Sequence, residues 1–300
     1  MTVSTKLSQD AGLSRRSAMF GIGAFTILPV CTAAARAPAG WDLGRIEATL
    51  GGRIGVSAVN LQTHQSLAHR EHDRFAMCST FKWALAAQVL AEVDRGEADL
   101  EERLSYSQDD LVPYSPITGP RASHGFMTIG DLCAAAVTIS DNTAANLLLR
   151  RFGGPIAFTA FLRRAGDDVT RLDRMETDLN ENAAGDPRDT TTPAAMVGTM
   201  SRFLFGELLS TASRNLLRTL MQSSTTGTNR LRAGFPLGWT VGDKTGTSIN
   251  GASNDVAFAL PGNGSGPILI ACYIDAPDAT AEARNAAHEH IARKVALHLA

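Results

Sequence analysis

The stretch STFKWALAAQVLAEV, residues 79–93, decides the fold. From Phe81 to Val93 its residues are apolar nearly all round, and Arg95-Gly96 follows it, a pair typical of a helix C-terminus. A helix without a polar face is buried in a core and does not lie on a surface. We therefore predict that the middle of the chain forms a helical core.

Strand patterns occur on both sides of this core in the sequence. Before it, residues 54–58 alternate in polarity and residues 66–69 follow a polar turn, which indicates a hairpin. After it come three runs rich in β-branched or aromatic residues, separated by Gly, Asn and Ser turns: residues 238–244, 255–260 and 268–274. Strands near both ends with helices between them predict that the termini pair in one antiparallel sheet.

Further helices complete the predicted fold. Residues 41–50 form one, and Thr128 to Asp131 has the pattern of a capping box that opens another through Val137. In the last, residues 281–299, one apolar stripe recurs at every fourth position: Ala287, Ile291, Val295 and Leu299. The predicted fold class is α/β (α+β), an antiparallel sheet flanked by terminal helices and packed against an all-helical lobe.

This pattern predicts two lobes with a site between them. The α/β lobe takes residues 38–77 plus 223–300, and the all-α lobe takes residues 78–222. Lobe interfaces are favoured places for substrate pockets. With 28 Lys and Arg against 30 Asp and Glu, and no long run of one sign, neither nucleic acid nor a membrane surface is expected as a partner. We expect a monomer that acts on a small molecule.

The first 37 residues have the pattern of a bacterial export signal that is removed. Arg15-Arg16 precedes an uncharged stretch, residues 17–30, and small residues follow at cleavage-like spacing. The paired arginines resemble a twin-arginine signal, which predicts a periplasmic protein. Cys31 is an alternative lipidation site, although Val30 before it is not a small residue. The apolar run is too short to span a membrane comfortably, so no stable membrane association is expected.

The cysteines and histidines give no metal signature, and no metal and no cofactor is predicted. After the signal the chain holds Cys78, Cys133 and Cys272, an odd number that allows at most one disulfide bridge. Three buried thiols are the favoured interpretation. His288-Glu289-His290, in a helix expected at the surface, lacks the i, i+4 spacing of a helical zinc pair.

Ser79 and Lys82 are a candidate nucleophile and base. They stand three residues apart, so both side chains share one face of a helix that begins near Ser79. Burial and the positive end of the helix would lower the pKa of Lys82, and the amine could then accept the serine proton. The N–H of Ser79 would point at the attacked carbonyl. Taken alone, the pair is equally explained by an N-cap serine with an exposed lysine.

Two further motifs supply polar groups in a suitable order. In Ser140-Asp141-Asn142, the hydroxyl can pass a proton to a leaving nitrogen and Asn142 can hold a substrate amide, although all three residues also favour helix N-termini. Lys244-Thr245-Gly246 ends a predicted strand, where small residues let a substrate lie along the sheet edge. The Lys244 amine and the Thr245 hydroxyl can bind a carboxylate there.

Together these motifs resemble those of class A serine β-lactamases, and the resemblance covers residues 41–300. It implies an α/β lobe against an all-α lobe. The implied activity is the opening of the β-lactam ring of penicillins and cephalosporins, through an acyl-enzyme on Ser79, which confers antibiotic resistance. Whether the acylating base is Lys82, or Glu176 acting through a water, stays open.

The resemblance makes Glu176-Thr177-Asp178-Leu179-Asn180 the deciding motif. It implies that Glu176 and Asn180 position the water that hydrolyses the acyl-enzyme, whereas wall-building relatives stay acylated. A general base contributes roughly 10²–10⁴ in rate. Arg174 and Asp189 resemble the pair that ties the family's Ω-loop shut. Thr177 replaces a proline that many relatives have after a cis peptide, so the bond after Glu176 is either cis or trans.

Other residues take implied roles from the same resemblance. Tyr114 resembles the aromatic that walls the pocket, Arg230 the arginine that assists carboxylate binding in one branch, and Thr247 should offer a second oxyanion N–H. In the carbapenem-hydrolysing branch a cysteine matching Cys78 is bridged, but the partner position here is Ser248. Another branch bridges a cysteine that matches Cys133, and Ala87 stands at its partner position. The hydroxyls of Ser248 and Thr247 are expected to help the enzyme accept bulky cephalosporins.

Two alternatives compete with a β-lactam hydrolase. A D-Ala-D-Ala peptidase is disfavoured by the Glu176 and Asn180 motif and by the absence of an additional domain. A penicillin-sensing domain, which binds covalently without turnover, normally needs a membrane segment to pass its signal.

Overall fold

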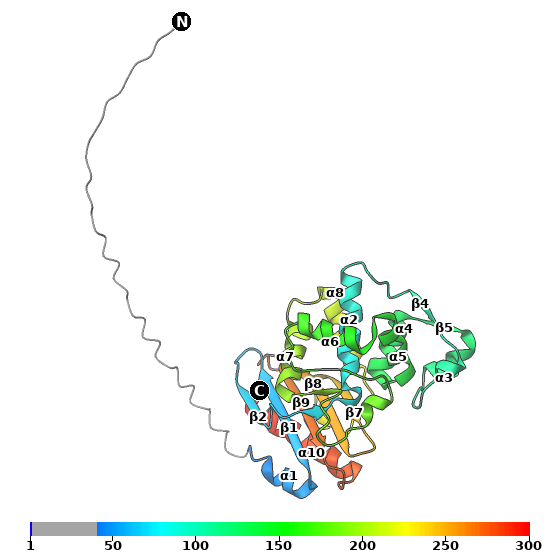
Figure 1. Cartoon of the computed structure of the whole chain (residues 1–300). Coiled ribbons are helices and arrows are strands. Elements are labelled where there is room, and N and C mark those ends of the chain that lie inside the picture. The colour runs from blue at the N-terminus through cyan, green and yellow to red at the C-terminus, as the bar shows by residue number, and fades with distance from the viewer. Residues whose placement is uncertain (2–40) are drawn as a thin grey trace. The chain divides into compact units, whose positions relative to one another are not determined.

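Five antiparallel strands form the central sheet of the computed structural model, which describes residue 1 and residues 41–300 (Figure 1). Their order across the sheet is β2-β1-β9-β8-β7. The strands are β1 (Arg53–Asn60), β2 (Ser66–His69), β7 (Thr240–Thr247), β8 (Ala252–Leu260) and β9 (Ile268–Asp275). Because β1 pairs with β9 along its whole length, the two ends of the chain share one antiparallel sheet, as predicted.

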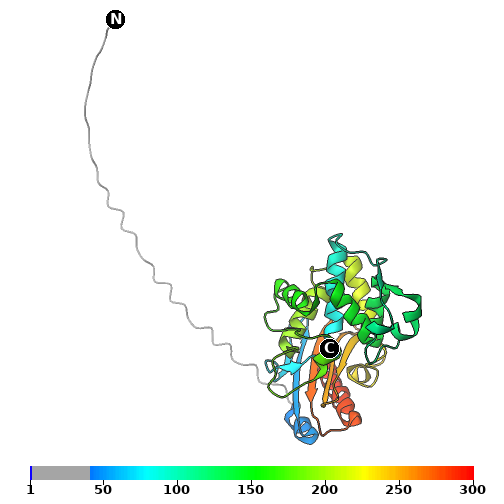
Figure 2. The ribbon, with the colours of Figure 1, turned by 45° about the vertical axis from the view of Figure 1, so that its right-hand side comes forward.

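Alternate side chains of the strands enter two different apolar cores. In β9, Ile270, Cys272 and Ile274 pack with α1 (Gly44–Leu50) and α10 (Ala281–Leu299). Leu269, Ala271 and Tyr273 belong to the other core, with the larger group of helices. The predicted stripe of α10 is buried at every position: Ala287, Ile291, Val295 and Leu299. Figure 2 shows α10 on the other side of the sheet from the larger group of helices.

The helix α2 (Phe81–Asp94) lies at the centre of the second core. Its side chains are buried from Phe81 to Ala91, and Gly96 adopts a positive φ of 73° just beyond its end. The helices around it and over the same sheet face are α3 (Thr118–Arg121), α4 (Ile129–Ala134), α5 (Asn142–Arg151), α6 (Gly154–Arg164), α7 (Pro193–Met200) and α8 (Thr211–Gln222). The short helix α9 (Leu231–Gly234) instead packs with α10 in the first core, through Leu231. The prediction of a helix buried on all sides is therefore confirmed.

Short elements connect these helices. Two small ribbons pair β3 (Phe75–Ala76) with β6 (Thr190–Thr191), and β4 (Arg103–Ser105) with β5 (Phe126–Thr128). The 3₁₀ turns are η1 (Cys78–Thr80), η2 (Gln108–Asp110), η3 (Ala122–His124) and η5 (Asp178–Asn180). Two π-helical turns occur, η4 (Ala135–Ile139) and η6 (Ser201–Phe205). Residues from 41 onward belong to one compact unit.

Three local expectations need correction. Thr128 caps α4, since its Oγ1 accepts from Asp131 N at 3.1 Å, but η4 replaces the last turns of the predicted helix. Lys244-Thr245-Gly246 lies inside β7 and not at its end, because pairing with β8 continues as far as Thr247. His288 is fully buried although its helix was expected at the surface, because it faces Ser253 of β8.

The predicted export signal, residues 1–37, lies outside the described residues apart from Met1, and so does Cys31. In the described part of the chain, no helix is long and apolar enough to cross a membrane.

Candidate active site

The turn that precedes α2 holds Ser79 at the edge of a cavity. Ser79 is half-buried, and its Oγ donates to Glu176 Oε1 at 3.1 Å. Because η1 leads directly into α2, the backbone N–H of Ser79 belongs to the N-terminal end of the helix, where N–H groups lack intrahelical partners. The hydroxyl is thus held between a carboxylate and a helix start.

Lys82 lies one turn further on and is completely buried. Its Nζ lies 2.9 Å from Glu176 Oε1, and donates to Ser140 O at 2.9 Å and to Asn142 Oδ1 at 2.5 Å. Burial lowers the pKa of the Lys82 amine, and the nearby Glu176 carboxylate opposes this shift. Ser79 and Lys82 therefore meet at one carboxylate oxygen, which places all three groups within proton-transfer distance.

Glu176 is fixed from three sides. Asn180 Nδ2 donates to its Oε2 at 2.5 Å. The side chain of Asn146 accepts from Glu176 N at 2.9 Å and donates to Glu176 O at 2.8 Å. The Glu176–Thr177 peptide bond is cis, one of the two alternatives that the sequence left open. The sequence analysis missed Asn146, although it stands four residues after Asn142 and so shares its helix face.

Ser140 joins the two buried lysines. Its Oγ accepts from Lys244 Nζ at 2.9 Å and from Lys82 Nζ at 3.4 Å. The residue follows η4 with a positive φ of 67°, and the next one, Asp141, caps α5 by accepting from Ala144 N. Burial, together with the charge of Lys82, lowers the pKa of Lys244 well below its ordinary value. A hydroxyl in contact with two such amines can pass its proton to another group while it receives one from an amine.

The edge strand β7 forms one wall of the cavity. A Cβ on Gly246 would lie 2.5 Å from Met77 O, so only glycine lets β7 approach the turn that carries the serine. Thr245 Oγ1 lies 2.7 Å from Thr226 Oγ1, a contact that the sequence analysis missed. The sequence indicates Thr226 only through its hydroxyl and its place in the segment that leads to the predicted site residue Arg230.

Arg230 contacts the same strand, β7. Its guanidinium donates to Gly246 O at 2.9 Å, to Asn254 O at 2.7 Å and to Thr247 Oγ1 at 2.7 Å. These bonds hold the arginine against β7, and both Arg230 and Thr247 line the cavity. Burial lowers the pKa of Arg230 below its ordinary value.

The predicted site residues gather around one cavity of about 320 Å³. Its lining is Ser79, Tyr114, Ser140, Asn142, Asn180, Thr226, Arg230, Thr245, Gly246 and Thr247. An adjoining cavity of about 490 Å³ shares part of this lining and adds Thr177, Ser248 and Ile249. Lys82, Glu176 and Lys244 are buried beside the first cavity through the contacts above. Arg174 and Asp189 line neither, and instead form an ion pair at 2.6 Å that closes the loop between them, the Ω-loop (residues 174–189).

The three cysteines that the structure describes, Cys78, Cys133 and Cys272, are free thiols, and all are buried. Burial raises the pKa of Cys78 and of Cys133. Among the described residues no group of three or more His, Cys, Asp or Glu side chains is arranged to hold a metal ion. His288 contacts Ser253 O at 3.0 Å through Nε2.

On this fold, a serine hydroxyl is held against a buried amine and a buried carboxylate, and this combination is typical of the serine hydrolases. A family model described as the β-lactamase enzyme family matches residues 42–299. The chain therefore belongs to the β-lactamase enzyme family, as its motifs predicted.

Individual relatives place the chain among class A enzymes. It is 44% identical over 245 residues to β-lactamase FAR-1 of Nocardia farcinica (strain IFM 10152). The aligned residues cover 82% of this chain and 78% of that relative. A solved ancestral class A β-lactamase (GNCA) is 50% identical with a TM-score of 0.82, over 84% of this chain and 96% of that one. The putative class A β-lactamase PenP of Rhodopseudomonas palustris is 49% identical with the same TM-score and coverage.

Proposed function

We propose that this protein hydrolyses the β-lactam ring of penicillins and cephalosporins through an acyl-enzyme on Ser79, and so confers antibiotic resistance. One observation carries the proposal. Ser79 Oγ at 3.1 Å and Lys82 Nζ at 2.9 Å share one oxygen of Glu176 at the edge of a cavity. Nucleophile, amine and carboxylate are thereby in place for a two-step acyl transfer.

In the first step Ser79 Oγ attacks the lactam carbonyl and loses its proton. Either Lys82 or Glu176 takes that proton, and both are in contact with the same site. The developing oxyanion binds to the N–H groups of Ser79 and Thr247, and the close approach of Gly246 to the turn that carries Ser79 supports this pairing. Losing one such donor costs roughly 10²–10³ in rate.

Ser140 completes the ring opening by giving its proton to the leaving nitrogen. Lys244 Nζ at 2.9 Å can then restore that proton, so the hydroxyl acts as a relay. The substrate carboxylate binds along β7, to Lys244 and Thr245, and Arg230 supports it by orienting Thr247. The substrate carboxylate is well placed there, because the buried amines of Lys244 and Lys82 both lie at Ser140 beside this wall.

In the second step Glu176 removes a proton from the water that attacks the acyl carbonyl. The ester bond to Ser79 Oγ then breaks, and the proton returns from Glu176 to the serine oxygen, which restores both groups. Asn180 helps to hold that water, and its Oδ1 is buried without a hydrogen-bond partner among the described residues. Such an atom normally has a partner, and a water or substrate N–H would supply it. Asn142 binds the substrate side-chain amide, and Tyr114, largely exposed at the rim, walls the cavity. The Arg174–Asp189 pair holds the loop that carries Glu176.

The cellular setting belongs to the same proposal. The protein is exported to the periplasm by the signal in residues 1–37, and acts there as a monomer without stable membrane association. The catalytic site lies between the α/β lobe, residues 38–77 plus 223–300, and the all-α lobe, residues 78–222.

A turnover count separates this function from its two alternatives. Purified protein is mixed with a large excess of a chromogenic cephalosporin, and the hydrolysed substrate is divided by the protein present. A hydrolase gives many turnovers and a Ser79→Ala variant gives none. A single burst equal to the protein concentration, without steady hydrolysis, would instead identify a penicillin-sensing domain or a trapped peptidase.

A further inference from the structure

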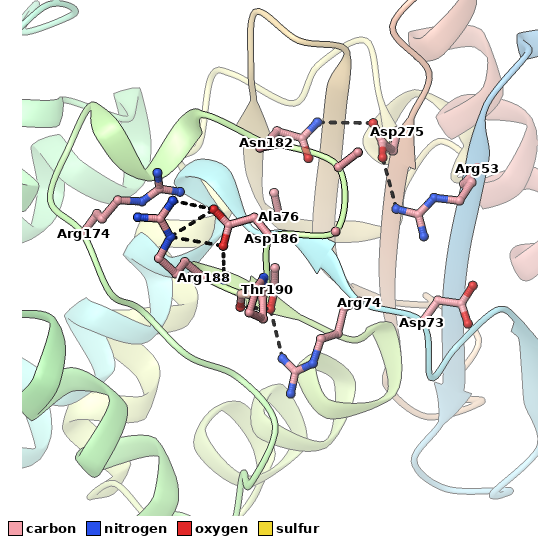
Figure 3. A pocket seen from close by; sticks show the side chains of 14 residues that line it. Arg53, Asp73, Arg74, Ala76, Arg174, Asn182, Asp186, Arg188, Thr190 and Asp275 are labelled. Carbon is pink, nitrogen blue, oxygen red and sulfur yellow. Dashed lines mark hydrogen bonds and ion pairs between the residues drawn. The ribbon is translucent and has the colours of Figure 1, made fainter.

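A separate cavity of about 470 Å³ lies on the outer side of the Ω-loop, and it shares no lining residue with the cavity at Ser79 (Figure 3). It is bounded by the ends of β1 and β9, by the ribbon of β3 and β6, and by residues 182–188 of the loop. Its lining is rich in charge: Arg53, Arg74, Arg174, Arg188, Asp73, Asp186 and Asp275. Nothing in the proposed hydrolysis uses it.

The aspartates of this cavity are already occupied. Asp275 accepts from Arg53 NH2 at 3.1 Å and from Asn182 Nδ2 at 3.2 Å, one bond on each oxygen. Both oxygens of Asp186 accept from Arg188, at distances between 2.7 and 3.1 Å. The oxygens of Asp275 and Asp186 therefore already accept hydrogen bonds from protein groups.

Asp73, the third aspartate of the lining, pairs with an arginine outside the cavity. Asp73 Oδ2 lies 3.6 Å from Arg70 NH1, and Arg70 does not line the cavity. Arg174 is neutralised in the same way from within the loop, through Asp189 and Glu181.

The arginines, in contrast, keep donors free. Arg74 donates only through NH1, to Val169 O at 3.1 Å and to Thr190 Oγ1 at 3.0 Å, and no carboxylate in the described part of the chain lies within ion-pair distance of it. Arg53 uses only NH2 in hydrogen bonds, and Arg188 uses its side-chain Nε and NH2. Since each guanidinium has five N–H donors, Arg53, Arg74 and Arg188 each keep side-chain donors that make no hydrogen bond within the described part of the chain.

We propose that this cavity binds a small polyanion, whose carboxylate or phosphate groups accept hydrogen bonds from Arg53, Arg74 and Arg188. Guanidinium groups bind both kinds of anion in a bidentate manner. The volume suits a small organic molecule and exceeds what one inorganic ion needs. Figure 3 shows Arg53 and Arg188 on opposite sides of the cavity, with Arg74 between them.

Binding would connect the sheet to the Ω-loop. Arg53 belongs to β1, Arg74 precedes β3, and Arg188 belongs to the loop that carries Glu176. A ligand held by all three adds a link between elements that Asn182 and Asp275 already join. Occupancy therefore restrains the loop without touching the catalytic cavity.

The test measures binding directly and does not depend on β-lactam turnover. Citrate and pyrophosphate are titrated separately by calorimetry against the full-length protein, with sodium chloride at equal ionic strength as reference. We expect saturable binding of at least one probe, and a Tm that rises by roughly 5 °C at a hundredfold excess over Kd. Stabilisation equal to that given by sodium chloride would overturn the proposal. Preference for citrate or for pyrophosphate tells which anion the cavity takes.

Two matched variants locate the site. Arg74→Gln should weaken binding at least tenfold, whereas Arg45→Gln, at an exposed arginine of α1 outside the cavity, should leave Kd unchanged. Arg74→Lys keeps the charge without the fork and should give an intermediate Kd. Equal affinity in Arg74→Gln and Arg45→Gln would place the anion elsewhere and reject this site.

Hydrogen exchange tests the link to the loop. With the bound probe, amides of residues 174–189 should exchange several-fold more slowly in the parent protein, and at an unchanged rate in Arg74→Gln. Bound ligand without slower exchange in that segment would disprove the restraint.

Discussion

The two sides of the Ω-loop bury charge in different ways. On the catalytic side, the side chains of Lys82 and Glu176 are 0% exposed and share their contacts with several partners. On the outer side, Arg188 is 48% exposed and pairs with Asp186 at 2.7 Å and, more distantly, with the exposed Glu181 at 3.7 Å. The ion pair of Arg174, 16% exposed, lies between these extremes.

The difference shows which contacts serve chemistry and which serve shape. A buried charge that loses one partner stays desolvated, so the catalytic cluster can be changed only at a large cost. An exposed pair is solvated as soon as it separates, so it contributes little on its own. Substitutions on the two sides should therefore differ in kind as well as in size.

The largest effect is expected at Glu176. Glu176→Gln removes the base but keeps a side chain of the same shape, so deacylation should slow by roughly 10²–10⁴ and a covalent adduct should accumulate with penicillin. Intact-mass spectrometry detects the adduct. Glu207→Gln, at an exposed carboxylate, is the control and should turn over like the parent. If Glu176→Gln hydrolyses penicillin as fast as the parent, its assigned role is wrong.

The next effect concerns the tie of the Ω-loop. Asp189 accepts from the backbone N of Asp173 at 2.7 Å and from Arg174 at 2.6 Å. Asp189→Asn removes the buried carboxylate that pairs with Arg174 and leaves it only the exposed Glu181. This should destabilise the fold by about 3 kcal/mol, which lowers Tm by several degrees in thermal denaturation.

The exposed pair provides the comparison for that measurement. Arg188→Gln, followed by the same circular-dichroism melt in the absence of polyanions, should change Tm by about 1 °C or less. A drop as large as that of Asp189→Asn would remove the contrast between the two pairs.

A third kind of buried group sharpens the contrast, because His288 is buried without a countercharge. Burial lowers its pKa from 6.5 to about 3. Between these values the unfolded chain binds a proton here and the folded chain does not, so stability is lost as pH falls below 6.5. The loss amounts to about 2 kcal/mol at pH 5, at roughly 1.4 kcal/mol per pH unit.

Urea unfolding at pH 7 and pH 5 measures this loss. His288→Gln keeps a donor for Ser253 O but does not titrate, so its stability should change less between the two pH values than that of the parent. His72→Gln, at a side chain that is 82% exposed, should behave like the parent. An unchanged pH dependence in His288→Gln would assign the acid sensitivity to other groups.

The smallest effect is expected at Ser248. Its Oγ accepts from Asn250 N at 2.8 Å and so fixes the turn beside the adjoining cavity. Ser248→Gly loses this bond, worth about 1 kcal/mol, and kcat/KM for a bulky cephalosporin should fall about fivefold while that for a penicillin is kept. Equal cephalosporin turnover would contradict the expected role of this hydroxyl.

The sequence predicted the elements whose partners are local or whose pattern is long. Residues 281–299 form α10 with the predicted bounds, since the apolar stripe spans the whole helix. The end of β7 was wrong because it depends on pairing with residues of β8, which no local pattern contains. The π-turn before Ser140 and the burial of His288 likewise depend on tertiary contacts.

The same division applies to the candidate site. Motif order located Ser79, Lys82 and Lys244, which the structure brings together. Asn146 belongs to none of the motifs. Its role depends on a tertiary contact, because its side chain makes two hydrogen bonds to the backbone of Glu176.

The strand order also determines how much of the chain must be synthesised before the sheet can form. β1 lies between β2 and β9, and β9 is the last strand to be synthesised. A ribosome-bound chain that ends before residue 268 therefore cannot complete the sheet, and its β1 and β8 lack their shared neighbour. The catalytic wall of β7 rests on β8, so no active enzyme forms until nearly the whole chain is available.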